Sequence, residues 1–112
     1  MQEEGLNKDE AKPYSLEEGR ELVEQARHVI EAAVTSTRFN KAIMKEQLHR
    51  FRQHHGVFVT IEFYPTEVLR GCIGFVQHPE NVSSLLVEAA LAAATEDPRF
   101  VPVSRHELEH LI

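Results

Sequence analysis

The sequence predicts an α/β domain of the α+β kind, in which helices pack on a mixed or antiparallel sheet. Apolar residues recur at helical spacing over residues 22–34, every second residue is apolar over residues 57–63, and alanines crowd residues 89–94. The first and last patterns are typical of helices that pack on a neighbour, and the alternation is typical of a strand with one buried face. With 112 residues, the chain has room for a single domain.

Composition and charge narrow the range of environments and partners. The net charge of −6 disfavours non-specific binding to nucleic acid or anionic lipid. One cysteine cannot form an internal disulfide, and no apolar run approaches the roughly 20 residues that span a bilayer. We therefore expect a cytoplasmic protein that is not bound to a membrane.

The first helix begins after a polar stretch. Residues 1–14 show no periodicity, and we expect a flexible N-terminal arm there, followed by one domain over residues 15–112. Ser15 and Glu18 form a capping box, which predicts a helix that continues to about Ser36. The apolar stripe of this helix consists of Leu22, Val23, Ala26, Val29, Ile30, Ala33 and Val34.

A second helix is predicted over residues 40–52, after a break at residues 35–39. Asn40 is its expected cap, and Gly56 lies where a helix-ending glycine is common. Its basic residues are Lys41, Lys45, Arg50 and Arg52. A basic amphipathic helix can lie on nucleic acid, although such charges more often form a solvated face.

The two predicted strands are joined by a short turn. Residues 57–63 and 68–77 flank the turn at residues 64–67, so the strands are expected to pair as an antiparallel hairpin. In a regular second strand, one face holds Leu69, Gly71, Ile73 and Phe75, and the other holds Val68, Arg70, Cys72, Gly74 and Val76.

The last third of the chain is predicted to be mainly helical. Asn81 is the expected cap of an alanine-rich helix, which ends before Pro98 because the residue before a proline disfavours helix. An extended loop follows. Ser104 and Glu107 form a second capping box, which predicts a short helix that reaches about Leu111.

The run Leu-Arg-Gly-Cys-Ile-Gly at residues 69–74 contains the only cysteine of the chain. Two glycines in one strand indicate close approach of another group, so Gly71 and Gly74 are candidate substrate-binding positions. A nearby cation lowers the pKa of a thiol and makes it nucleophilic, so Cys72 and Arg70, on the same predicted face, are candidate catalytic residues. The alternative is that Cys72 is a small hydrophobic residue buried under the helices.

The charged residues around this strand have a structural and a functional interpretation. Arg70 either forms an internal ion pair with Asp97 or Glu96, or uses its planar fork to bind a carboxylate or phosphate group of a ligand. Asp97 and Arg99 are expected to fix the loop at the sheet edge, and they are also candidate substrate-binding residues.

The sequence predicts no metal site and no cofactor. Residues 106–110 read His-Glu-Leu-Glu-His, an H-E-x-x-H pattern that zinc hydrolases place on a helix. The predicted helix is barely two turns long, and matches to so short a pattern arise by chance. The run at residues 71–74 is not a phosphate-binding loop, because no lysine follows its glycines.

The run at residues 69–74 resembles the signature of the AMMECR-one domain family. Residues 56–60, 97–100 and 108–112 follow the family pattern in the same order, and the resemblance extends from Ser15 to the end of the chain. It covers the N-terminal part of such domains, and it implies an α/β fold with two unequal subdomains and the signature strand at its centre. It also implies association with Memo-like and radical-SAM proteins, in the system named AmmeMemoRadiSam.

These observations leave three functions open. The main hypothesis is a binding or catalytic component of a Memo and radical-SAM associated enzyme system, with its site around the LRGCIG strand. The alternatives are a nucleic-acid-associated regulatory module that uses residues 40–52, and a scaffolding domain without its own chemistry. Because an isolated hairpin is marginal, we expect the C-terminal half, another chain or a second copy to complete the sheet.

Overall fold

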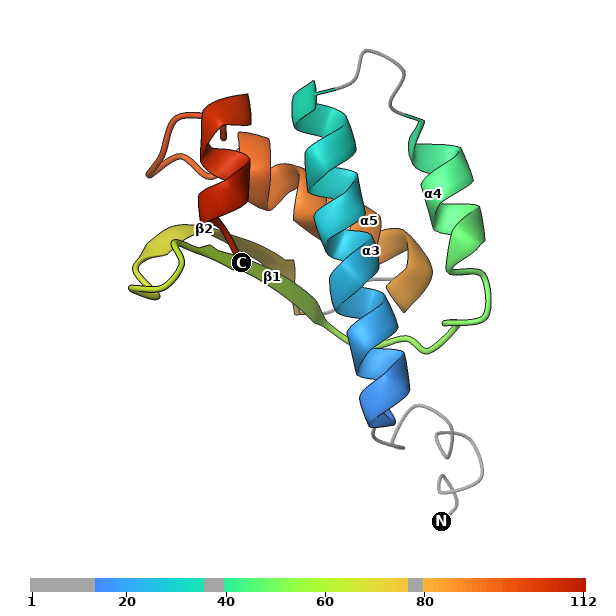
Figure 1. Cartoon of the computed structure of the whole chain (residues 1–112). Helices are drawn as coiled ribbons and strands as arrows, with labels where there is room; N and C mark the ends of the chain where they lie inside the picture. Colours follow the sequence, from blue (N-terminus) through green and yellow to red (C-terminus); the bar gives the residue numbers. More distant parts are fainter. Residues whose placement is uncertain (1–13, 36–39, 77–79) are drawn as a thin grey trace.

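Helices cover one face of an antiparallel hairpin (Figure 1). The computed structural model describes residues 14–35, 40–76 and 80–112. Its elements are, in chain order, α3 (Leu16–Thr35), α4 (Lys41–Gln47), β1 (Val57–Glu62), β2 (Leu69–Phe75), α5 (Val82–Thr95) and the 3₁₀ helix η1 (Arg105–His110). This arrangement confirms the predicted α+β class. Within the described ranges, none of these helices is long and apolar enough to cross a bilayer.

Several predicted boundaries lie outside the described residues. These are the arm over residues 1–13, the end of the first helix at Ser36 with the break that follows, and the end of the second strand at Gln77. Tyr14 is described, and its ring packs edge-on against Phe51 with 5.7 Å between the ring centroids. The packed domain therefore includes Tyr14, one residue before its predicted start.

α3 begins at the predicted capping box and buries only part of its apolar stripe. The Ser15 hydroxyl accepts a hydrogen bond from the Glu18 amide at 3.0 Å, and the Glu18 carboxylate accepts one from the Ser15 amide at 2.9 Å. Val29 and Ile30 are buried, whereas Val23 is 70% exposed. The described residues thus leave part of the apolar stripe uncovered in the first half of the helix.

α4 ends at Gln47 and is shorter than the predicted helix, which was expected to reach residue 52. The backbone groups of the residues that follow α4 form hydrogen bonds with α5 instead. The carbonyl oxygens of Phe51 and Gln53 accept hydrogen bonds from the amides of Ser83 and Val82, at 3.1 and 2.9 Å. These amides belong to the first turn of α5 and have no acceptor within that helix. The chain therefore leaves the helical path before Phe51.

β1 and β2 pair as the predicted antiparallel hairpin, in which Val57 lies opposite Phe75 and Ile61 opposite Gly71. The buried residues of β1 are Val57, Val59 and Ile61. They lie on the face that packs against α5, as the alternation predicts. The opposite face, here called the open face, carries the exposed side chains of Phe58 and Thr60.

β2 departs from regular alternation at Arg70. The register shifts between Ile61 and Glu62 of β1, which leaves Arg70 with no partner opposite it. Such a bulge re-aims the side chain of the extra residue. The predicted common face of Arg70 and Cys72 depends on regular alternation, and this prediction was wrong.

α5 is the central helix, since it packs on both strands of the hairpin, on α3 and on α4 (Figure 1). Most of its residues are buried, which explains why it carries many alanines and little polar surface. A Cβ atom at Gly71 would clash with the carbonyl oxygen of Ala93. Small residues on both sides therefore let the helix lie close to β2, as the glycines predict.

Gly74 is covered from the open face. Phe58 lies opposite it on β1, and the Phe58 ring would clash with any Cβ atom at Gly74. An aromatic ring over a cross-strand glycine supplies packing that the glycine lacks.

The chain after α5 ends on the edge of β1 that faces away from β2. η1 starts at the second predicted capping box, where the Ser104 amide donates to the Glu107 carboxylate at 2.9 Å, and it is a 3₁₀ helix. Beyond it, Glu62 and Ile112 exchange two backbone hydrogen bonds of 2.8 Å each. The last described residues therefore pair with this edge of β1 through an isolated antiparallel bridge, in which Leu111 lies opposite Phe63.

Gly71→Ala is expected to destabilise the domain by about 1–3 kcal/mol, the usual cost of overpacking, because its Cβ meets the Ala93 carbonyl. Gly19→Ala in α3 is the matched control, since no atom lies within 4 Å of the added Cβ. It should stabilise the helix by about 0.5–1 kcal/mol. Urea unfolding of both variants measures these changes, and a neutral Gly71→Ala would contradict the close contact of α5 with β2.

Candidate functional site

Cys72 lies on the open face of the hairpin. Its cross-strand partner is Thr60, whose hydroxyl oxygen is 3.4 Å from the Cys72 sulfur. The Cys72 side chain is half-buried. The thiol is therefore not packed under the helices, and it is partly accessible from solvent.

The Arg70 guanidinium bonds to Glu107 of η1, and η1 lies on the same side of the hairpin as α5 (Figure 1). Arg70 is 5% exposed, and its Nε and Nη2 donate to the two carboxylate oxygens of Glu107 at 2.7 and 2.9 Å. Its guanidinium also lies over the Phe100 ring, 5.6 Å from the centroid. Arg70 does form an internal ion pair, but the predicted partners Asp97 and Glu96 were wrong.

Asp97 and Arg99 fix the loop after α5 to an edge of β2, as predicted. Asp97 Oδ2 accepts a hydrogen bond from the Cys72 amide at 2.9 Å, and Oδ1 accepts from the amide and Nε of Arg99 at 3.0 Å each. These donors, chiefly the Arg99 guanidinium, hold the pKa of Asp97 well below its usual range. Because Asp97 is buried while the Arg99 side chain is 56% exposed, Arg99 is a fixed, accessible cation beside Cys72.

The two glycines of the signature are explained by packing. Gly71 meets the backbone of Ala93, and Gly74 lies under the ring of Phe58.

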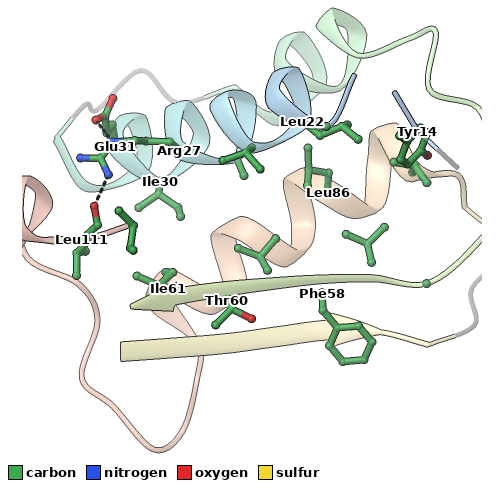
Figure 2. Close-up of a pocket in the computed structure, with 18 of the residues that line it drawn as sticks. Tyr14, Leu22, Arg27, Ile30, Glu31, Phe58, Thr60, Ile61, Leu86 and Leu111 are labelled. Atoms are coloured by element: carbon green, nitrogen blue, oxygen red, sulfur yellow. Dashed lines mark hydrogen bonds and ion pairs between the residues drawn. The ribbon is translucent and has the colours of Figure 1, made fainter. Parts of the chain in front are cut away.

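A groove of about 520 Å³ lies elsewhere, between α3 and β1 (Figure 2). None of residues 69–74 lines it.

The basic side chains of the predicted nucleic-acid surface are mostly engaged in ion pairs. Lys41 and Lys45 both contact Glu88, at 3.3 and 2.9 Å, and Arg50 contacts Glu21 at 2.6 Å. A nucleic-acid phosphate would have to compete with these carboxylates. The geometry therefore does not favour the nucleic-acid alternative.

The H-E-x-x-H run lies on η1. A 3₁₀ helix has three residues per turn, so its residues at i and i+4 are not stacked as on an α-helix. Glu107, the second residue of the run, is bonded to Arg70 at 2.7 Å. In the parts of the chain that the structure describes, no group of three His, Cys, Asp or Glu side chains could hold a metal ion.

Glu107 is the residue near the signature whose role the sequence reasoning missed. The sequence assigns Glu107 to a capping box and to the H-E-x-x-H pattern, yet Oε1 accepts both from the Ser104 amide and from Arg70 Nη2. Arg70 and Glu107 are 37 positions apart. No local pattern joins residues at that separation, so the sequence offered no signal for the pair.

The ion pair makes stability depend on pH. The hydrogen bonds from Arg70, assisted by those from Ser104, lower the pKa of Glu107 to about 2. An unfolded glutamate titrates near 4.3. The pair therefore stabilises the fold fully above about pH 4.5, and this contribution is lost as the pH falls toward 2.

Glu107→Gln is expected to destabilise the domain by about 3 kcal/mol at neutral pH, because it leaves the buried Arg70 without a counter-charge. The difference in unfolding free energy between wild type and variant should narrow as the pH falls from about 4.5 to 2, because Glu107 becomes protonated in the wild type. Urea unfolding across this range measures it. Glu109→Gln, at an exposed position of η1, is the control and should change little; a difference that stays constant with pH would contradict the pair.

Comparison with known proteins agrees with this fold. The crystal structure of the uncharacterized protein PH0010 from Pyrococcus horikoshii superposes with a TM-score of 0.64 at 31% sequence identity. The superposition covers 83% of this chain and 47% of that chain.

Sequence relatives and a family model identify the family of this chain. A protein of Caldivirga maquilingensis is 40% identical over 104 residues, which is 90% of this chain and 48% of that protein. A protein of Methanothermobacter thermautotrophicus is 42% identical over 99 residues, which is 88% of this chain and 50% of that protein. The chain thus spans about half the length of the curated relatives it matches. Since the AMMECR1 family model matches residues 23–112 as well, the chain belongs to the AMMECR1 family.

Proposed function

We propose that this chain is a binding component of a multi-protein enzyme system and that it presents the open face of the hairpin, around Cys72, to a protein partner. The signature run resembles that of proteins associated with Memo-like and radical-SAM enzymes, and these are the partners that we propose. Membership of the AMMECR1 family supports the resemblance.

This proposal rests on the exposure of the open face of the hairpin. The described helices pack on the other face of the hairpin. The open face carries the side chain of Phe58, which is 61% exposed. It also carries Leu69, which is 36% exposed: the bulge places Leu69 opposite Glu62, on this face and not on the predicted face of Gly71. Arg99 adds an accessible cation at the rim. Exposed apolar patches with a polar rim are typical of protein–protein interaction sites.

The contacts favour binding over catalysis by this chain alone. Nε and Nη2 of Arg70 are occupied by Glu107, and the Asp97 carboxylate is occupied by Arg99 and the Cys72 amide. The neighbour of the Cys72 sulfur is the hydroxyl of Thr60. A nucleophilic cysteine is usually activated by an adjacent base such as histidine, and a hydroxyl does not take that role.

Leu69→Glu is expected to weaken binding to the Memo-like or radical-SAM protein of the same genome at least tenfold, which is about 1.4 kcal/mol. The reason is that it places a charge on the open face. Ile43→Glu replaces an exposed apolar residue of α4, away from the sheet, and should leave binding unchanged. Isothermal titration calorimetry measures both; an equal effect of the two substitutions, or no binding by the wild type, would contradict the proposal.

The Cys72 thiol is expected to react with iodoacetamide in the folded protein, more slowly than in urea because it is half-buried. Since it is the only cysteine, mass spectrometry of the intact chain reports on this residue alone. Partner binding on the open face should slow the reaction further. A thiol that reacts only after unfolding, at every pH tested, would rule out an exposed Cys72 site.

A further inference from the structure

Two hydrogen-bond donors flank Cys72 on the open face. The Thr60 hydroxyl lies 3.4 Å from the Cys72 sulfur, on the side of β1. Arg99 Nη2 lies 3.5 Å from the Cys72 carbonyl oxygen, at the edge of β2 where Asp97 binds the Cys72 amide. Thr60 and Arg99 are both exposed. A hydroxyl and a guanidinium thus lie on opposite sides of one half-buried thiol.

Asp97 holds the guanidinium of Arg99 in one orientation. Nε and Nη2 of Arg99 donate to the two carboxylate oxygens of Asp97, at 3.0 and 2.8 Å. Asp97 is itself buried and accepts the Cys72 amide at 2.9 Å. The Phe100 ring also lies against the guanidinium, with its centroid 5.5 Å from Arg99 Cζ. A side chain held in this way has little rotamer freedom left to lose when it binds a ligand.

The outer end of the Arg99 guanidinium has unused donors. Nη1 carries N–H groups of its own, separate from those of Nε and Nη2. The hydrogen bonds of the Arg99 side chain to described residues all come from Nε and Nη2. Because the side chain is 56% exposed, Nη1 is a donor that solvent and a partner can reach.

We propose that the protein partner presents an aspartate or glutamate side chain whose carboxylate accepts hydrogen bonds from Arg99 Nη1 and the Thr60 hydroxyl, beside an apolar residue that packs on Phe58. This inference rests on the proposed function, since it names the group that the partner brings to the open face. Charge-assisted hydrogen bonds from arginine to a carboxylate are stronger than neutral ones. Phe58 and Thr60 both extend from β1 on the side away from α3 (Figure 2).

The charges near Cys72 favour a ligand group with a single negative charge. The Arg99 guanidinium lowers the pKa of Asp97, so this carboxylate stays ionised and offsets much of the Arg99 charge. Glu62, opposite Leu69 on the open face, adds another negative charge. A phosphate group carries close to two negative charges at neutral pH and would meet one partly neutralised cation. A carboxylate therefore fits this surface better than a phosphate.

Isothermal titration calorimetry with the Memo-like or radical-SAM protein of the same genome tests this contact. Thr60→Val removes the hydroxyl, keeps the shape of the side chain and leaves the ion pair of Asp97 with Arg99 intact. We expect it to weaken binding about fivefold, as for the loss of one hydrogen bond. Thr66→Val removes a hydroxyl from the exposed turn of the hairpin, and this control should bind as the wild type does.

Arg99→Gln removes the cation. We expect it to weaken binding about tenfold and to make binding less sensitive to salt. Arg52→Gln changes an exposed arginine that follows α4, and this control should leave affinity and salt dependence unchanged. Since Arg99→Gln leaves the buried Asp97 without its counter-charge, circular dichroism checks its fold, and Thr60→Val decides the matter if that fold is lost. Wild-type affinity in both Thr60→Val and Arg99→Gln would overturn the carboxylate contact and leave the proposed function intact.

A small carboxylate tests the same position without a partner. Sodium acetate, exchanged for sodium chloride at constant ionic strength, should shift the NMR signals of the Arg99 Nε–H group and of the Thr60 and Cys72 amides. Signals of α4 should not move, and the shifts should be smaller in Thr60→Val. If neither partner binds, the proposed function fails while acetate shifts at these groups still support the carboxylate position. Absence of these shifts in that case would overturn the inference as well.

Discussion

The close contact between Gly71 of β2 and Ala93 of α5 sets the spacing of this fold. α5 packs on both strands and against α3 and α4, so its distance from the hairpin determines where the other helices can lie. Protein interiors are close-packed, and a side chain inserted at such a contact moves backbone as well as neighbouring side chains. The first requirement on the signature run is therefore steric.

The same strand connects four parts of the domain, because its residues have different neighbours. Gly71 contacts α5, Arg70 bonds to η1, and the amide of Cys72 bonds to the loop after α5. The Cys72 side chain faces the open side of the hairpin with Thr60. The bulge at Arg70 makes this division possible, since regular alternation would place the guanidinium beside the thiol.

A two-stranded sheet covered on one face has two surfaces that the described residues leave uncovered. The open face exposes Phe58 and Leu69, and an apolar groove lies between α3 and β1. The first surface offers exposed side chains and the second a concave apolar lining, so they suit different occupants. Their presence agrees with a chain that spans about half the length of its relatives.

The sequence by itself determined the class of the fold, the hairpin, both capping boxes and the close approach at the glycines. Each of these depends on residues within a few positions of one another, or on a periodicity that shows which face is buried. Only the tertiary structure decided the partner of Arg70, which lies 37 positions away at Glu107, and the early end of α4, where Phe51 bonds to the first turn of α5. Such contacts depend on which surfaces meet when the helices pack on the sheet, and local spacing carries no information about that.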